Sequence, residues 1–189
     1  VFGSGTNFPS PWREALFACD WAYGRIFAVH LQPSGASFTG TSEIFASGEP
    51  FPVTDVVAGP DGALYVTIGG RQSQSGLYRI AWSGPAVQAT AGWPARGEGV
   101  GLRHALESYH GAPAPERAAM LVEQGFLGHA DPFVRYAARI ALESQPAAEW
   151  ARAVEASEDT RGWLEGALAR VRCGAVEERT KVLLAAAEL

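Results

Sequence analysis

One hairpin sequence decides the fold of the first half of the chain: Val53-Thr54-Asp55-Val56-Val57-Ala58-Gly59-Pro60-Asp61-Gly62-Ala63-Leu64-Tyr65-Val66-Thr67-Ile68. β-Branched and aromatic residues flank Asp61-Gly62, and Asp-Gly supplies the backbone geometry of a tight turn, so two antiparallel strands are predicted. A third strand is predicted at Leu77–Trp82, after the polar loop Gly69–Gly76, and a fourth at Ala86–Thr90.

The segment before this hairpin repeats the pattern. Strands are predicted at Ala15–Cys19, Arg25–Leu31 and Ser42–Ala46, with a turn at Asp20–Gly24. Four antiparallel strands in succession are typical of one β-propeller blade, so the first half predicts about two blades, the first without a clear inner strand. Because closed propellers have about 4–8 blades, we expect further blades before Val1 and interpret the chain as a piece of a longer protein.

The second half of the chain has helical periodicity. Its sharpest motif is Asp131-Pro132-Phe133-Val134-Arg135-Tyr136-Ala137-Ala138-Arg139-Ile140-Ala141-Leu142, with Asp131 as the predicted N-cap and Pro132 at the first helical position. One apolar face is predicted to contain Phe133, Tyr136, Ala137, Ile140 and Ala141, and a second helix to bury Trp163, Leu164, Ala167, Leu168 and Val171. Besides the helix that starts at Pro132, the predicted helices are Leu102–Tyr109, Glu116–Phe126, Ala147–Ala156, Thr160–Arg172, which contains the second face, and Val176–Leu189.

The Asp131 motif resembles the second helix of a HEAT repeat, in which the Asp and Arg commonly stabilise the turns between stacked repeats. The expected fold is therefore multidomain, β then α. It has a partial β-propeller of about two antiparallel blades at 1–90, a linker at 91–99 and an α-helical HEAT-like solenoid at 100–189. Solenoid contacts are local, so we expect the helical half to fold more independently than the strand half, with a continuation after Leu189.

Composition narrows the classes of partner. The chain has 15 basic and 20 acidic residues and a formal charge of -5, without the clustered basic face that nucleic acid requires, so nucleic acid is not a predicted partner. No apolar run approaches the roughly 18 residues of a membrane span. No disulfide is predicted between the distant Cys19 and Cys173. The histidines lack the paired spacing of a metal site and are interpreted as structural or exposed; they are His30, His104, His110 and His129.

A candidate binding face follows from blade topology, because the loop between the second and third strands opens beside the segment that leads into the innermost strand. Arg71 and Asp55 are the candidate cofactor-binding residues, since a guanidinium suits carboxylates and a carboxylate suits hydroxyls or a cation. Alternatively, Asp55 caps the start of a strand and Arg71 is solvated in its loop. For Trp21 and Tyr23 we favour packing between blades. The predicted face comprises Asp20, Trp21, Tyr23, Thr54, Asp55 and Arg71.

Several short motifs together resemble the last propeller blades and the helical repeats of one bacterial family. These motifs are Phe2–Gly5, Ala15–Phe17, Asp20–Gly24, Ala28–Leu31, Pro52–Asp55, Gly59–Tyr65, Gly69–Arg71, Arg103–Glu107 and Phe133–Glu143. The family comprises large secreted or membrane-associated proteins similar to soluble glucose/sorbosone dehydrogenases. In them a β-propeller is followed by HEAT-like repeats and a c-type cytochrome domain.

The resemblance implies a larger periplasmic, secreted or membrane-associated protein that oxidises a sugar or alcohol and passes electrons to haem. Pyrroloquinoline quinone and calcium are its candidate cofactors, and its partners are the missing blades and the cytochrome domain. The chain contains no Cys-x-x-Cys-His haem motif, and no residue in it is assigned a catalytic role. It would serve as propeller edge and helical scaffold without being catalytic itself. The alternative is a non-enzymatic binding or scaffold protein for extracellular polysaccharide or protein.

Overall fold

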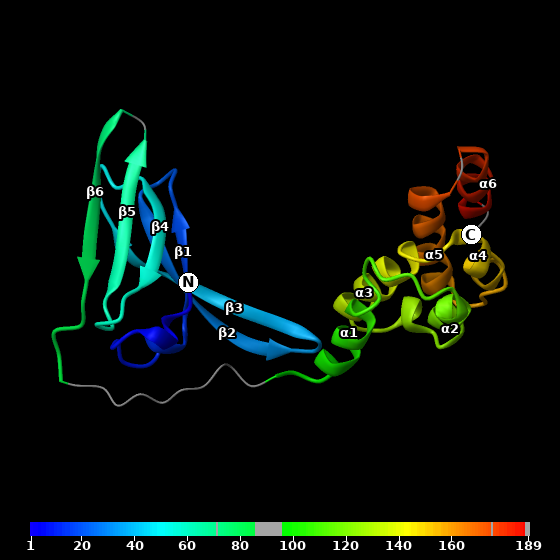
Figure 1. Ribbon diagram of the computed structural model, residues 1–189, viewed down its shortest axis with the longest axis horizontal. Coiled ribbons are helices and arrows are strands. Elements are labelled where there is room, and N and C mark those ends of the chain that lie inside the picture. The colour runs from blue at the N-terminus through cyan, green and yellow to red at the C-terminus, as the bar shows by residue number, and fades with distance from the viewer. Residues whose placement is uncertain (71, 86–95, 175, 188–189) are drawn as a thin grey trace. The chain divides into compact units, whose positions relative to one another are not determined.

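The computed structural model describes residues 1–70, 72–85, 96–174 and 176–187. Within them the chain is β then α, as predicted, with two three-stranded sheets followed by six α-helices (Figure 1). The strand unit comprises Val1–Pro33 and the described residues from Phe38 to 85, whereas the helical unit comprises Ser34–Ser37 and the described residues from Arg96 onward. The helical unit therefore includes four residues from the first half of the sequence.

The first sheet has β2 at its centre, between β1 and β3. β1 and β2 are antiparallel, with Leu16 opposite Val29 and Asp20 opposite Arg25. The three predicted strands are all present, although β2 and β3 extend well beyond their predicted ends. The bounds are β1 (Leu16–Asp20), β2 (Arg25–Ser34) and β3 (Ser37–Ser47).

The first two residues of the chain pair with the edge of β1 that faces away from β2. The amino group of Val1 donates to the Phe17 carbonyl oxygen over 2.9 Å, and the Phe17 N–H donates to the Val1 carbonyl oxygen over 2.7 Å. Phe2 forms an isolated antiparallel bridge with Leu16. At the inner edge of the first predicted blade, where the sequence showed no clear strand, Val1 and Phe2 thus form a short antiparallel pairing with β1.

The second sheet contains the predicted Asp61-Gly62 hairpin. Gly62 adopts a φ of +76° and donates its N–H to the Gly59 carbonyl oxygen over 3.0 Å, which closes the turn between β4 and β5. The predicted polar loop Gly69–Gly76 is wrong in extent, because strand pairing continues until Gly70 lies opposite Ser73. The predicted strand Ala86–Thr90 lies outside the described residues. The bounds are β4 (Val53–Ala58), β5 (Leu64–Gly70) and β6 (Ser73–Ile80).

Both sheets contribute to one hydrophobic core in the strand unit. β1 lies beside β4, and the buried side chains come from β1, β2, β4 and β5 together with the segment before β1. Phe45 packs its ring 4.7 Å from that of Phe17 and 5.4 Å from that of Phe8, measured between ring centres. This shared core fixes the loops at the strand ends of both sheets relative to one another.

The helical unit contains six α-helices in the described residues, in which α3 contacts both α1 and α5, and α2 contacts α4. The predicted helix Glu116–Phe126 is interrupted, because Gly125 adopts a φ of +72° just after α2 and a 3₁₀ turn follows. The bounds are α1 (Val100–Glu107), α2 (Ala118–Glu123), α3 (Pro132–Glu143), α4 (Ala147–Glu155), α5 (Thr160–Cys173) and α6 (Val176–Ala186).

The predicted N-cap of α3 is confirmed, and it has an additional partner. The Asp131 carboxylate accepts hydrogen bonds from the Phe133 and Val134 N–H groups over 2.8 and 3.3 Å. Its other oxygen accepts the N–H of Ala36 over 2.7 Å. Ala36 is fully buried in the core of the helical unit. One carboxylate therefore joins the start of α3 to a turn about a hundred residues earlier in the sequence.

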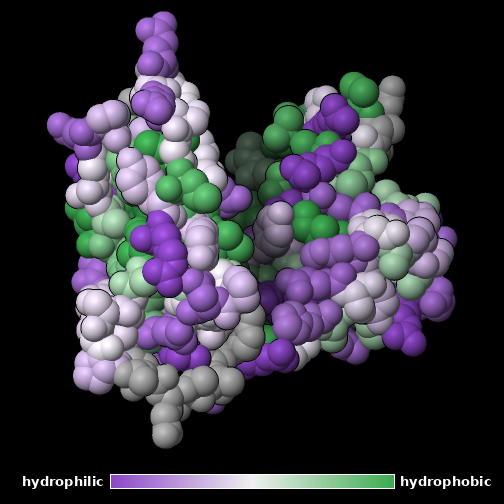
Figure 2. Space-filling model, turned by 60° about the vertical axis from the view of Figure 1, so that its left-hand side comes forward, coloured by the Kyte–Doolittle hydropathy of each residue, from purple (hydrophilic) through white to green (hydrophobic). Residues whose placement is uncertain are grey.

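The predicted buried faces of the helices are partly wrong. Phe133 and Tyr136 are about half exposed, whereas the buried side of α3 includes Val134, Ala138 and Leu142. In α5, Leu164 and Leu168 are likewise exposed, and the buried positions are Gly162, Gly166, Ala167 and Ala169. Small residues let neighbouring backbones approach closely, so the larger apolar side chains lie outside. Hydrophobic side chains consequently remain at the surface of both units (Figure 2).

Candidate functional site

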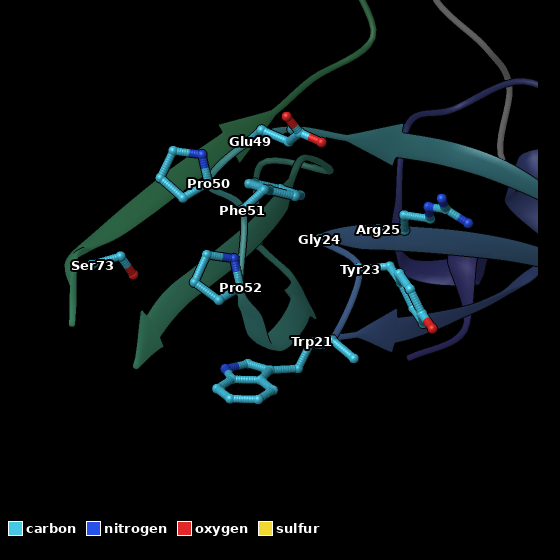
Figure 3. A pocket seen from close by; sticks show the side chains of 11 residues that line it. Trp21, Tyr23, Gly24, Arg25, Glu49, Pro50, Phe51, Pro52 and Ser73 are labelled. Atoms are coloured by element: carbon cyan, nitrogen blue, oxygen red, sulfur yellow. The ribbon is translucent and has the colours of Figure 1, made fainter. Parts of the chain in front are cut away.

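A pocket of about 340 Å³ lies in the strand unit, where three segments meet (Figure 3). The segments are the β1–β2 turn, the residues that lead into β4 and the start of β6 at Ser73. They are separate in sequence and are brought together by the core that the two sheets share. The volume is at the lower end of the range for small-ligand pockets, about 300–1,000 Å³.

The β1–β2 turn is held in one shape by short polar contacts. The Asp20 carboxylate accepts the Tyr23 N–H over 3.1 Å, and Gly24 adopts a φ of +64°. The Gly48 N–H donates to the Gly24 carbonyl oxygen over 3.1 Å, and a Cβ at Gly24 would lie only 2.7 Å from the Gly48 carbonyl oxygen. A glycine at position 24 is thus required both by φ and by space, and the turn is fixed against the segment before β4.

Two aromatic side chains of this turn stand at the pocket. The Trp21 Nε1–H donates to the Gly69 carbonyl oxygen over 2.9 Å, and its ring lies against Gly70 at the end of β5. Trp21 therefore connects the two sheets while leaving 41% of its surface exposed. Tyr23 is 72% exposed. The predicted packing role therefore explains the position of Trp21 only in part, and most of the Tyr23 side chain is not packed.

Two charged side chains line the same pocket from different segments. Arg25 is the half-buried first residue of β2, and its guanidinium carbon lies 5.4 Å from the centre of the Tyr23 ring. In the part of the chain that the structure describes, no carboxylate forms an ion pair with Arg25. Glu49 is exposed and precedes Phe51, whose ring packs edge-on against Tyr78 at 5.6 Å. The pocket thus presents aromatic surface, the N–H donors of the Arg25 guanidinium and the carboxylate of Glu49.

The structure brings together some of the residues predicted for the binding face. Trp21 and Tyr23 line the pocket together with Pro52 and Ser73. Arg71 lies outside the described residues.

Asp55 and Thr54 are exposed on β4 and do not line the pocket. The Asp55 carboxylate accepts the Val56 N–H over 2.8 Å, and the Thr54 hydroxyl lies 2.9 Å from that of Thr67. Burial raises the pKa of the Cys19 thiol and the charge of Asp55 raises it further, against the lowering effect of the chain's amino group. The polar contacts of Asp55 and Thr54 are therefore made with β4 and β5.

Sequence reasoning missed Arg25, Glu49 and Phe51. Their proximity depends on the Gly24–Gly48 contact, which no local pattern reveals. The available signal was the aromatic residue between two prolines in Pro50-Phe51-Pro52, which is unusual for a plain connection between strands.

The histidines have structural contacts. The His30 Nε2 lies 3.0 Å from a Glu43 carboxylate oxygen, and the His110 Nε2 lies 2.9 Å from the Ala137 carbonyl oxygen. The His129 Nδ1 accepts the Asp131 N–H over 3.0 Å. Within the described ranges no group of three or more His, Cys, Asp or Glu side chains is arranged to hold a metal ion.

The chain was compared with models of protein families, with curated proteins and with solved structures. No model of a protein family matches it, and neither does any curated protein or any solved structure. None of the described helices combines the length and the apolar composition needed to cross a membrane.

Proposed function

We propose that the strand unit binds a saccharide in the pocket formed by Trp21, Tyr23, Arg25, Glu49 and Phe51. The main support is that the exposed aromatic rings of Trp21 and Tyr23 line the same pocket as two charged side chains. Arg25 is a positively charged hydrogen-bond donor, and Glu49 is a negatively charged acceptor. A sugar ring has an apolar C–H face that stacks on aromatic rings and an edge of hydroxyls that both donate and accept. Such a combination of apolar walls with a few oriented polar groups is the usual composition of a ligand pocket.

The proposal extends to the fold. The two sheets are taken as two β-propeller blades, supported by their consecutive strand order and by the pairing of Val1 and Phe2 along β1. The helical unit is taken as HEAT-like repeats, supported by the contacts of α3 with both α1 and α5. In this arrangement the helical unit acts as a scaffold or docking surface, outside the cytoplasm if the family resemblance holds.

A saccharide pocket is compatible with both hypotheses drawn from the sequence. In a binding or scaffold protein the sugar is the ligand, whereas in a dehydrogenase-like electron-transfer protein it is the substrate. The described residues near the predicted binding face do not supply enough oxygen ligands for calcium, which takes about 6–8. The Asp55 carboxylate is turned onto its own strand, and no acidic group gathers around it in the described ranges. We therefore derive no catalytic step through calcium or pyrroloquinoline quinone and place the binding function first.

The test is a titration of the full chain with a panel of neutral and acidic oligosaccharides, followed by calorimetry and by NMR shifts of the pocket residues. Tyr23→Ala is expected to weaken binding about tenfold, because an aromatic contact contributes about 0.5–1.5 kcal/mol beyond its buried area. Tyr136→Ala removes an exposed tyrosine from the helical unit and should leave binding unchanged. Failure of every saccharide to bind, or equal affinity of the Tyr23→Ala variant, would overturn the proposal.

The electron-transfer hypothesis has its own test. A longer protein with the expected additional blades would be supplied with pyrroloquinoline quinone and calcium, and dye-linked sugar oxidation would be measured. Oxidation of a bound sugar would make the pocket a substrate site, whereas binding without oxidation across the panel would favour the scaffold hypothesis.

A further inference from the structure

The position of Arg25 distinguishes it from an ordinary surface arginine. It is half-buried at the start of β2, and its guanidinium lies over the Tyr23 ring at 5.4 Å. Asp20 is directly opposite Arg25 in the β1–β2 ladder, yet its carboxylate accepts the Tyr23 N–H and forms no ion pair with Arg25. Within the described part of the chain the guanidinium therefore has an aromatic partner but no carboxylate partner.

This arrangement prepares the guanidinium for an anion. A cation held against a ring loses less side-chain freedom on binding than a free one, and partial burial reduces the screening of its charge by solvent. Glu49, the opposite charge at the pocket, is exposed, so its repulsion of an anion is weakened by water and salt. The favourable interaction at Arg25 is thus expected to outweigh the unfavourable one at Glu49.

We propose that the pocket selects acidic saccharides, and that Arg25 binds the carboxylate of a uronic acid residue through its two-pronged guanidinium. This inference rests on the proposed function and adds the ligand class to it. The planar guanidinium matches a carboxylate with two parallel hydrogen bonds, which a neutral sugar cannot offer. The ring of the same sugar residue lies beside Tyr23, the aromatic side chain over which the Arg25 guanidinium is placed.

A matched pair of ligands tests the selection. The full chain is titrated with a galacturonic acid trisaccharide and with the same trisaccharide after methyl esterification, which removes the charge and keeps the rings. Because a hydrogen bond to a charged group is stronger than a neutral one, the acid is expected to bind about tenfold tighter than the ester. The difference should shrink as salt concentration rises.

Variants assign the effect to Arg25. Arg25→Met keeps the unbranched stem and should abolish the preference for the acid, whereas Arg25→Lys keeps the charge and should retain part of it. Arg79→Met removes an exposed arginine that pairs with Asp61 and should leave the preference intact. Circular dichroism and NMR spectra of each variant establish that the fold is retained.

The outcomes separate the two proposals. Equal affinity of acid and ester for the unaltered chain, with binding retained, would overturn the acidic specificity and leave saccharide binding standing. A preference that survives in Arg25→Met would also overturn the role of Arg25. Absence of binding by acid, ester and the neutral panel would overturn the saccharide function itself.

Discussion

Replacing Asp131 by Ala should destabilise the helical unit by more than the removal of an ordinary N-cap side chain would. Removal of an N-cap side chain costs about 1 kcal/mol, with a range of about 0.5–2. In addition, the N–H of fully buried Ala36 loses its acceptor at 2.7 Å, and an unsatisfied buried donor costs about 1–3 kcal/mol. The sum is about 2–4 kcal/mol, a large part of the stability of a unit of this size.

The assay is urea unfolding of the full chain, followed by far-UV circular dichroism for the helical transition. The matched control is Asp159→Ala, because the Asp159 carboxylate caps α5 through the Arg161 and Gly162 N–H groups over 3.2 and 3.0 Å. That variant should lose only about 1 kcal/mol. Hydrogen exchange of the Ala36 amide gives a direct second measurement, since it should become faster in Asp131→Ala alone. Equal losses in the two variants, with the Ala36 amide still protected, would refute the reasoning.

The same carboxylate predicts a pH dependence. Burial acts to raise the pKa of Asp131, but the hydrogen bonds from the Ala36, Phe133 and Val134 N–H groups outweigh it and lower the pKa below its ordinary value. A pKa lowered by folding means that the stabilisation is complete above the unfolded-state pKa and is lost as pH falls through the folded-state pKa. Stability of the helical unit should therefore fall in acid, and Asp131→Asn should flatten that fall.

The remaining predictions concern single contacts. Arg79→Met should raise the pKa of Asp61 towards its ordinary value, because the hydrogen bond from Arg79 is the main cause of its lowering; an unchanged NMR titration would contradict this. Gly166→Ala should destabilise the chain by about 1–3 kcal/mol in urea unfolding, since its Cβ would lie 2.6 Å from both methyl carbons of Val154. Gly101→Ala, in an open helical position, should instead stabilise it by about 0.5 kcal/mol. A stabilising effect of Gly166→Ala would contradict the first expectation, and a destabilising effect of Gly101→Ala would contradict the second.

Local chemistry made parts of the fold predictable. The Asp61-Gly62 turn and the Asp131-Pro132 helix start are both present where the sequence indicated, because each depends on residues within one turn of the backbone. The buried helix faces were less predictable. Phe133 and Val134 are both apolar neighbours on α3, and only packing against the other helices decides that Val134 is buried and Phe133 is not.

The candidate site could likewise be predicted only in part from the sequence. Blade topology indicated that the β1–β2 turn and the β5–β6 turn share a face, and Trp21 and Ser73 do line one pocket. The partners Arg25 and Glu49 were not predictable, because they meet through the contact between Gly24 and Gly48 and not through a motif. The expectation for Arg71 stays a prediction, since that residue lies outside the described ranges.

The contact between Asp131 and Ala36 means that the core of the helical unit includes residues from the first half of the chain. Helical repeats normally fold through neighbouring contacts, which led to the expectation that the helical half is the more independent part. However, Ser34–Ser37 belongs to the helical unit, and Ala36 lies in its core beside residues such as Leu106 and Val134. A segment 98–189 would lack this turn and leave the second oxygen of Asp131 without its donor. Because the entropic cost of closing a loop grows only slowly with its length, this contact across 95 residues costs only a little more than the same contact across a much shorter loop would.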